Sequence, residues 1–382
     1  MLPPVNLAFV LDRSGSMGGS KIALAKSAIQ NALARLDDRD RFALIAYDDV
    51  VDVGTEGTAA TAEAKSTALE RLASIDARGS TNLSDGWLRG CEQVAAGMSD
   101  GAVSRCLLLT DGLANVGIKD PDALRTHAAE IRARGVSTTT FGVGADFDEL
   151  LLQSMADAGG GHFYYIDSAQ KITDIITSEV GEALEVVARN AAIAAHTPEV
   201  LVEPLSPLPL ERTGEATLVA LGDLVSEQSV QAVMKLTFPT GEAARQHDVT
   251  FRLTDRDGVL GGASATLGWR YASHPEVDAQ PRDRAVDRVV AELYAARARD
   301  EAIRFNREGR YDAAQHVLRG VAERIGAYAG DDTALQAVAA QLLGEQHVFA
   351  EAMSPRDRKM RHFASANMSR GRDFQGKANK GR

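Results

Sequence analysis

The sequence predicts an α/β domain with a doubly wound, mostly parallel sheet, followed by a small antiparallel β-sandwich domain and a C-terminal helical segment. Three observations support this class. Short apolar runs alternate with helical periodicity over roughly the first 185 residues, helical periodicity becomes scarce between residues 186 and 271, and it returns from residue 281. Because alternating strands and helices bury both faces of a sheet, the first region should fold around parallel strands.

The elements expected in the first domain follow in order along the chain. Continuous apolar or β-branched runs predict strands at residues 6–11, 41–47, 50–53, 105–110, 137–143 and 162–166. Apolar residues at helical spacing predict helices at residues 21–36, 60–75, 83–98, 122–134 and 147–158. Gly135, directly after the fourth helix, is a typical stop signal. We predict that this domain spans residues 1–182.

The rest of the chain divides into three parts. Runs typical of strands, separated by Pro and Gly, predict the β-sandwich at residues 183–273. Helical periodicity predicts a helical region at residues 274–355, with a hairpin at 298–325 that is either plain or of the tetratricopeptide type. The last part, residues 356–382, is basic and Gly-rich towards its end, which predicts a disordered tail.

The charge of the chain argues against nucleic acid as a partner. The 42 Lys and Arg are outnumbered by 53 Asp and Glu, which gives a net charge of -11. A protein this acidic is poorly suited to bind nucleic acid or an anionic membrane. The basic residues are concentrated in the tail, where nine Lys and Arg stand against two Asp and Glu from Pro355 onward.

Cysteine content and hydropathy suggest a cytoplasmic protein. The only two cysteines, Cys91 and Cys106, are too few for a disulfide framework and lie in apolar surroundings. No apolar run approaches the roughly 20 residues of a membrane helix, and the first residues lack the features of a signal peptide. We therefore expect a cytoplasmic location, unless an export signal has been removed.

Oxygen-bearing side chains follow the predicted strands at the points where they end. Asp12, Ser14 and Ser16 follow the first strand in a loop that Gly15 allows to turn, and Asp111 follows the strand at 105–110. Thr81 lies in a loop before the helix at 83–98. Because the carboxyl ends of parallel strands form the crevice of such sheets, these oxygens should meet there. Oxygen ligands without Cys or His suit a hard cation such as Mg²⁺, with Mn²⁺ or Ca²⁺ also possible.

The run FVLDRSGSM, the loop GSTN and the run LLLTDG together resemble the von Willebrand factor A (VWA) domain family, whose fold is Rossmann-like. The resemblance covers about residues 5–180. It implies a metal-ion-dependent adhesion site (MIDAS), with Ser14, Ser16 and Thr81 as hydroxyl ligands and Asp12 and Asp111 as carboxylate ligands, one or both through water. The later part, with LGDLVSEQSV, resembles the bacterial branch of the family, whose members often work beside MoxR-type AAA+ ATPases.

Two simpler interpretations of the same residues stay open. Asp12 and Thr81 are also typical helix caps, and Ser14, Ser16 and Asp111 are common in turns. In the second interpretation, the metal site forms but has no function. The eight histidines show no paired ligand spacing, so we interpret them as surface or core residues.

The leading functional hypothesis is a metal-dependent protein-binding module, not an enzyme. A Mg²⁺ ion held in this way keeps an exchangeable position, which an Asp or Glu of a partner protein could fill. No His or Lys accompanies these loops in a pattern typical of a catalytic base. A Mg²⁺-dependent hydrolase and a structural scaffold with an idle metal site are the alternatives.

Overall fold

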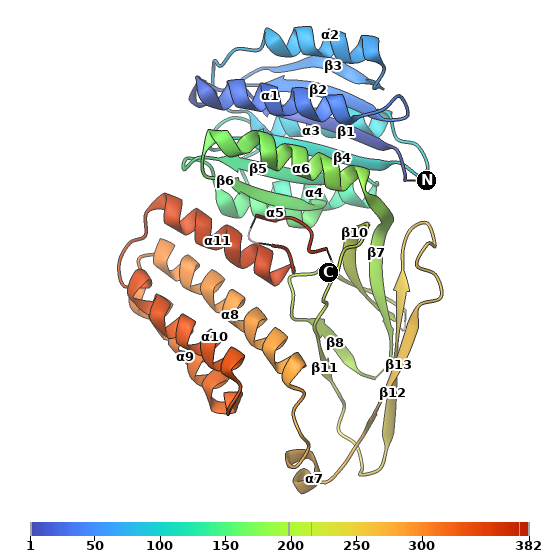
Figure 1. Cartoon of the computed structure of the whole chain (residues 1–382), viewed down its shortest axis with the longest axis vertical. Helices are drawn as coiled ribbons and strands as arrows, with labels where there is room; N and C mark the ends of the chain where they lie inside the picture. Colours follow the sequence, from blue (N-terminus) through green and yellow to red (C-terminus); the bar gives the residue numbers. More distant parts are fainter. Residues whose placement is uncertain (1, 198, 215, 374, 381–382) are drawn as a thin grey trace. The chain divides into compact units, whose positions relative to one another are not determined.

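The computed structural model describes residues 2–197, 199–214, 216–373 and 375–380. The chain forms two compact units, Met1–Val187 and Ala188–Arg382, whose elements are labelled in Figure 1. The boundary expected at residue 182 instead falls inside helix α6, Ile172–Leu184. This helix keeps burying apolar residues up to Ala183, so the first unit continues beyond the expected point.

A six-stranded sheet forms the centre of the first unit, in the order β3-β2-β1-β4-β5-β6. Its strands are β1 Val5–Asp12, β2 Arg41–Tyr47, β3 Val51–Ala59, β4 Val103–Thr110, β5 Ser137–Val143 and β6 Gly160–Ile166. All neighbours run parallel except β2 and β3. The central strands β1 and β4 are buried along their whole length, as their continuous apolar runs require.

Helices cover both faces of this sheet, which confirms the predicted doubly wound α/β class. They are α1 Ser20–Arg35, α2 Ala62–Ala73, α3 Leu83–Ala96, α4 Pro121–Ala133, α5 Glu149–Gly159 and α6. The helices α1, α2 and α6 pack on one face, and α3, α4 and α5 on the other (Figure 1). Thr61, Asp120 and Asp148 cap α2, α4 and α5 by accepting hydrogen bonds from backbone N–H groups.

The order of the strands reverses between β1 and β4. From β1 the chain continues to β2 and β3 on one side of the sheet, whereas β4 leads to β5 and β6 on the other. Leu11 of β1 pairs with Leu109 of β4, so both strands end at the same edge. Open α/β sheets bind ligands at this switch point, outside the carboxyl ends of the strands. The loops after β1 and β4 therefore lie where a binding site is expected.

The second unit begins with the predicted small antiparallel β-domain. A five-stranded sheet has the order β13-β12-β7-β10-β9, and β11 and β8 form a two-stranded sheet. The strands are β7 Val186–His196, β8 Leu201–Pro204, β9 Leu210–Thr213, β10 Ala216–Val225, β11 Met234–Thr237, β12 Gln246–Thr254 and β13 Ser264–Arg270. Val202 and Leu236 from the small sheet pack with Val249 and Trp269 from the large one, as in a sandwich.

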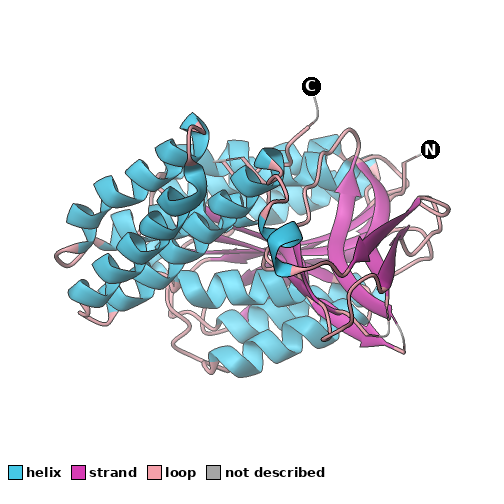
Figure 2. Ribbon diagram, turned by 90° about the horizontal axis from the view of Figure 1, so that it is seen from below, coloured by secondary structure: helices cyan, strands magenta, loops and turns pink. Residues whose placement is uncertain are grey.

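The predicted helical segment completes the second unit; Figure 2 distinguishes the helices of the molecule from its strands by colour. The helices are α7 His274–Asp278, α8 Arg284–Arg307, α9 Tyr311–Ala329, α10 Thr333–Glu345, a 3-10 turn η3 Gln346–Phe349, and α11 Pro355–Ser369. The predicted hairpin is the pair α8 and α9, which turns at Gly309 with a φ of 74°. None of the helices in the described part of the chain is long and apolar enough to cross a membrane.

The segment 356–382 differs from the disordered tail that its composition predicts. Residues 355–369 form α11, in which the Ser354 side chain accepts a hydrogen bond from the Asp357 N–H and Pro355 occupies the first turn. The helix packs along α8, where the Ser365 hydroxyl donates to the Ala296 carbonyl over 2.8 Å. A Ser-Pro start is a strong helix signal, and it outweighs the basic composition here.

Candidate metal centre

Three predicted ligands come from the end of β1 and the loop that follows it: Asp12, Ser14 and Ser16. Asp12 is fully buried, and its Oδ1 accepts a hydrogen bond of 2.8 Å from the Ser14 N–H. The Thr110 hydroxyl, at the end of β4, donates to Asp12 Oδ2 over 2.6 Å. Asp12 therefore connects the ends of the two strands that flank the switch point.

A chain of short contacts leads from this loop to the second carboxylate. The Ser14 and Ser16 hydroxyl oxygens lie 3.1 Å apart, and the Ser16 hydroxyl donates to Asp111 Oδ1 over 2.6 Å. Ser14 and Asp111 are buried, whereas Ser16 is exposed. The site therefore has a buried floor of carboxylates and an opening to solvent at Ser16.

Thr81 approaches this region from the third loop. Its backbone is fixed by Asn115, whose Oδ1 accepts from the Thr81 N–H over 3.0 Å and whose N–H donates to the Thr81 carbonyl over 3.2 Å. A Cβ atom added at Gly112 would lie 3.2 Å from Thr81 Oγ1 and 3.8 Å from Ser16 Oγ. Gly112, which has no side chain, therefore lies beside both the Thr81 and the Ser16 hydroxyl, so the loop of Thr81 comes near the other predicted residues.

Burial raises the pKa of Asp12 to about 6, although hydrogen bonds from Thr110 and Ser14 oppose this effect. The neighbouring charge of Asp111 contributes to this rise. Two carboxylates in a buried crevice repel each other, and a divalent cation between them would relieve that repulsion. The donor set, with oxygen atoms alone, fits a hard ion such as Mg²⁺.

Lys21 is a site residue that the sequence did not reveal. Its ammonium group donates to Asp111 Oδ2 and, over 3.3 Å, to the Ser16 carbonyl oxygen. Lys21 lies in the first turn of α1, five residues after Ser16. It is therefore outside the run FVLDRSGSM on which the predicted site was based. A positive charge is therefore already built into the crevice beside the carboxylate.

A second layer of charged residues fixes the loops around the site. Arg13 and Arg78 both donate to Asp48 Oδ2, through their Nε atoms, over 2.9 and 2.7 Å. Burial would raise the pKa of Asp48, but hydrogen bonds from the Val50 N–H and Arg78, and the charge of Arg13, hold it below its ordinary value. The Gly15 N–H also donates to the Gly79 carbonyl over 3.2 Å. These contacts join the loop of Ser14 to that of Thr81.

The first unit is thus an open α/β domain with an oxygen-lined crevice at its switch point, and comparison with known proteins identifies its family. The model of the von Willebrand factor type A domain matches residues 6–178. Residues 6–178 of this chain therefore belong to the von Willebrand factor type A domain family, whose members often mediate metal-dependent protein interactions.

Relatives match over half of the chain or somewhat more. YfbK of Escherichia coli (strain K12) is 32% identical over 191 residues, which cover 50% of this chain and 33% of YfbK. The protein sll0103 of Synechocystis sp. (strain ATCC 27184 / PCC 6803 / Kazusa) is 30% identical over 247 residues, covering 61% of this chain and 57% of that protein. The chain thus spans between a third and little more than half of these relatives.

A solved structure shares the fold over most of the chain. The von Willebrand factor type A protein from Catenulispora acidiphila aligns with a TM-score of 0.70 and 17% sequence identity, over 92% of this chain and 90% of that one. At this identity the likeness shows the fold alone. The combination of the α/β domain with a β-domain and C-terminal helices therefore recurs in another protein.

Proposed function

We propose that this chain is a metal-dependent protein-binding module that captures an acidic residue of a partner protein. In this proposal a Mg²⁺ ion is held, directly or through water, by five side chains: Asp12, Ser14, Ser16, Thr81 and Asp111. A carboxylate of the partner replaces a water molecule on the ion and completes its coordination. This function resembles that of other domains in the family.

The observation that supports the proposal most is the chain of short contacts that links four oxygen-bearing residues, Asp12, Ser14, Ser16 and Asp111, beside solvent. Thr81 lies close to this chain, next to Gly112. Three of the proposed ligands, Ser14, Ser16 and Thr81, are neutral, and the two carboxylates offset the charge of a dication, while Lys21 adds a positive charge beside Asp111. Such an ion keeps a strong attraction for a further anionic ligand. Ser16 is exposed, so a partner can approach from that side.

The partner class to test first is a MoxR-type AAA+ ATPase. This choice rests on the resemblance of the later part of the chain to the bacterial branch of the family. The chemistry of the site adds one requirement, namely that the partner present an exposed Asp or Glu side chain.

Matched peptide libraries test the proposal. One library carries a fixed Glu among random residues, and its control carries Gln at that position. We expect the full chain to enrich Glu peptides in Mg²⁺ and to lose them in EDTA or after Asp111→Asn. Equal recovery from both libraries, or recovery that persists in EDTA, would contradict the proposal. Turnover of generic phosphoesters that requires Mg²⁺ would instead favour the hydrolase alternative.

A further inference from the structure

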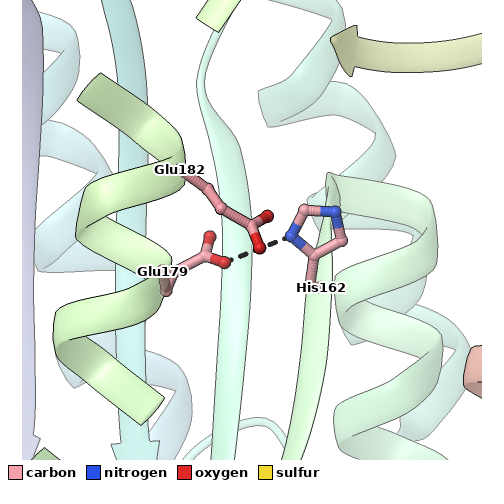
Figure 3. Close-up of side chains that lie close together, drawn as sticks. All are labelled: His162, Glu179 and Glu182. Atoms are coloured by element: carbon pink, nitrogen blue, oxygen red, sulfur yellow. Dashed lines mark hydrogen bonds and ion pairs between the residues drawn. The ribbon is translucent and has the colours of Figure 1, made fainter. Parts of the chain in front are cut away.

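A second group of metal-ligating side chains lies between β6 and α6 of the first unit. His162 comes from β6, and Glu179 and Glu182, three residues apart on α6, point towards it (Figure 3). One ligand atom from each residue lies within 4.8 Å of the other two. His162 is the third residue of β6, so the group lies near the amino ends of the strands, whereas Asp12 lies at the carboxyl ends.

Surrounding donors hold the Glu179 carboxylate in place. Glu179 is fully buried, and its Oε1 accepts hydrogen bonds from Arg105 Nη1 over 2.6 Å and from the Thr139 hydroxyl over 2.8 Å. The Tyr164 hydroxyl donates to Oε2 over 2.7 Å. Carboxylates that bind metal ions are commonly oriented by such hydrogen bonds, which reduces the cost of arranging them when an ion arrives.

The spacing of the His162 and Glu179 ligand atoms suits an ion held between helix and strand. His162 Nδ1 lies 3.2 Å from Glu179 Oε2. If an ion lay about 2.1 Å from each of these two atoms, the angle between its bonds to them would be about 100°, close to the tetrahedral angle that is typical of zinc. Glu182 is buried, whereas the His162 side chain is 24% exposed, which leaves a route to solvent.

We propose that His162, Glu179 and Glu182 bind a transition-metal ion of the Zn²⁺ class. An imidazole nitrogen combined with two carboxylates favours such an ion over Mg²⁺, which prefers oxygen ligands alone. The ion would connect α6 to β6, and its three protein ligands would leave a position for water. This site is independent of the proposed Mg²⁺ site, because the two lie at opposite ends of the sheet and differ in ligand chemistry.

The competing account is a hydrogen-bond network in which His162 simply donates to Glu179. Co²⁺ and Zn²⁺ titrations of the full chain distinguish the two. Asp111→Asn is introduced throughout to disable the site at Asp12 and Asp111. We expect one equivalent of Co²⁺ to bind with the visible absorption of a four- or five-coordinate ion, and Zn²⁺ to displace it.

Two substitutions locate the site. His162→Gln and Glu182→Gln should each weaken Zn²⁺ binding at least about tenfold. The control His127→Gln, in an exposed pair with Glu130 on α4, should leave it unchanged. Glu179 is kept because it pairs with buried Arg105. Circular dichroism checks that each variant is folded. If Glu182→Gln unfolds, His162→Gln decides the test, because the His162 side chain is partly exposed and its replacement should disturb the fold less. Absence of binding, or equal affinity in His162→Gln and the control, would overturn the proposal.

Discussion

At the scale of single residues, Lys21 and Asp111 form an ion pair within the proposed Mg²⁺ site. The ammonium group compensates the buried carboxylate when no metal is bound, and it repels an incoming dication. Lys21→Met should therefore lower the stability of the metal-free chain and raise its affinity for Mg²⁺. We expect the free energy of unfolding in EDTA to fall by about 1–3 kcal/mol, and the affinity for Mg²⁺ to rise at least about tenfold. Urea unfolding and titration calorimetry measure the two quantities.

The matched control for this prediction is Lys26→Met. Lys26 lies on the same helix but donates to the Ala73 carbonyl oxygen, over 3.0 Å, and to no carboxylate of the site. Its substitution should leave the affinity for Mg²⁺ unchanged. If Lys21→Met bound Mg²⁺ more weakly than the wild type, Lys21 would instead support the bound state.

Asp48 makes the stability of the first unit depend on pH. Its pKa is lower in the folded chain than in the unfolded chain, so the unfolded chain takes up this proton first as the pH falls. The contribution of ionised Asp48 to the free energy of unfolding is therefore complete above about pH 4, the ordinary pKa of an Asp side chain, and is lost as the pH falls below it. Asp48→Asn should cost about 3 kcal/mol at pH 7.

Urea unfolding from pH 7 to pH 3 checks this prediction. The difference between the wild type and Asp48→Asn should shrink below about pH 4. Glu92→Gln is the control, because Glu92 pairs with Arg89 on the exposed surface of α3 and contributes little. A difference that stayed constant down to pH 3 would show that the charge of Asp48 is not what stabilises the loops.

The sequence revealed some residues of the candidate site and not others, for a physical reason. Asp12 and Asp111 directly follow apolar strands, so the rule for parallel sheets places them at one edge. Arg13 and Asp48 meet only through the pairing of β1 with β2, and short motifs do not carry that information. His162 and Glu179 come together only when α6 packs against the sheet, which sequence spacing alone cannot show.

At the scale of elements, α11 allows a direct test of order near the C-terminus. A helix that packs along α8 should protect its backbone N–H groups from exchange with solvent. Hydrogen exchange followed by mass spectrometry should show slow exchange for peptides within residues 358–369. Exchange as fast as in an unstructured peptide would restore the interpretation of this segment as a disordered tail.

Element types were more predictable than element ends. The apolar runs of β1 and β4 allow only a buried strand or helix, and their length favours a strand. In contrast, β3 extends from Val51 to Ala59, well past the expected end at residue 53. This strand lies at the edge of the sheet, where most of its residues are half-buried or exposed and no continuous apolar run forms. Pairing with β2 fixes its length, and the pattern of β3 itself does not.

At the scale of the whole molecule, the two compact units should respond differently to Mg²⁺. All five proposed ligands lie in the first unit, so only its unfolding transition should depend on the ion. At a concentration 100 times the dissociation constant, binding stabilises by about 2.7 kcal/mol, which corresponds to about 5–10 °C for a unit of this size. Differential scanning calorimetry with and without Mg²⁺ should show one shifted transition. Equal shifts of all transitions would contradict this assignment.

The boundary between the units could not be located closely from composition. Helix α6 ends at Leu184 and β7 begins at Val186, so Glu185 alone separates them. A connection this short has no distinct composition, in contrast to the Pro- and Gly-rich segments that usually mark domain linkers.

The central claim is that the crevice at the ends of β1 and β4 binds a divalent metal ion. Titration calorimetry with Mg²⁺ on the wild type, Asp111→Asn and the control Asp100→Asn tests it most directly. Asp100 is exposed in the loop before β4, at the other end of the sheet. The account predicts one Mg²⁺ per wild-type chain, the same affinity in Asp100→Asn, and at least about a hundredfold weaker binding in Asp111→Asn, because a buried charge next to the ion is lost. Equal affinity in the wild type and Asp111→Asn would contradict it.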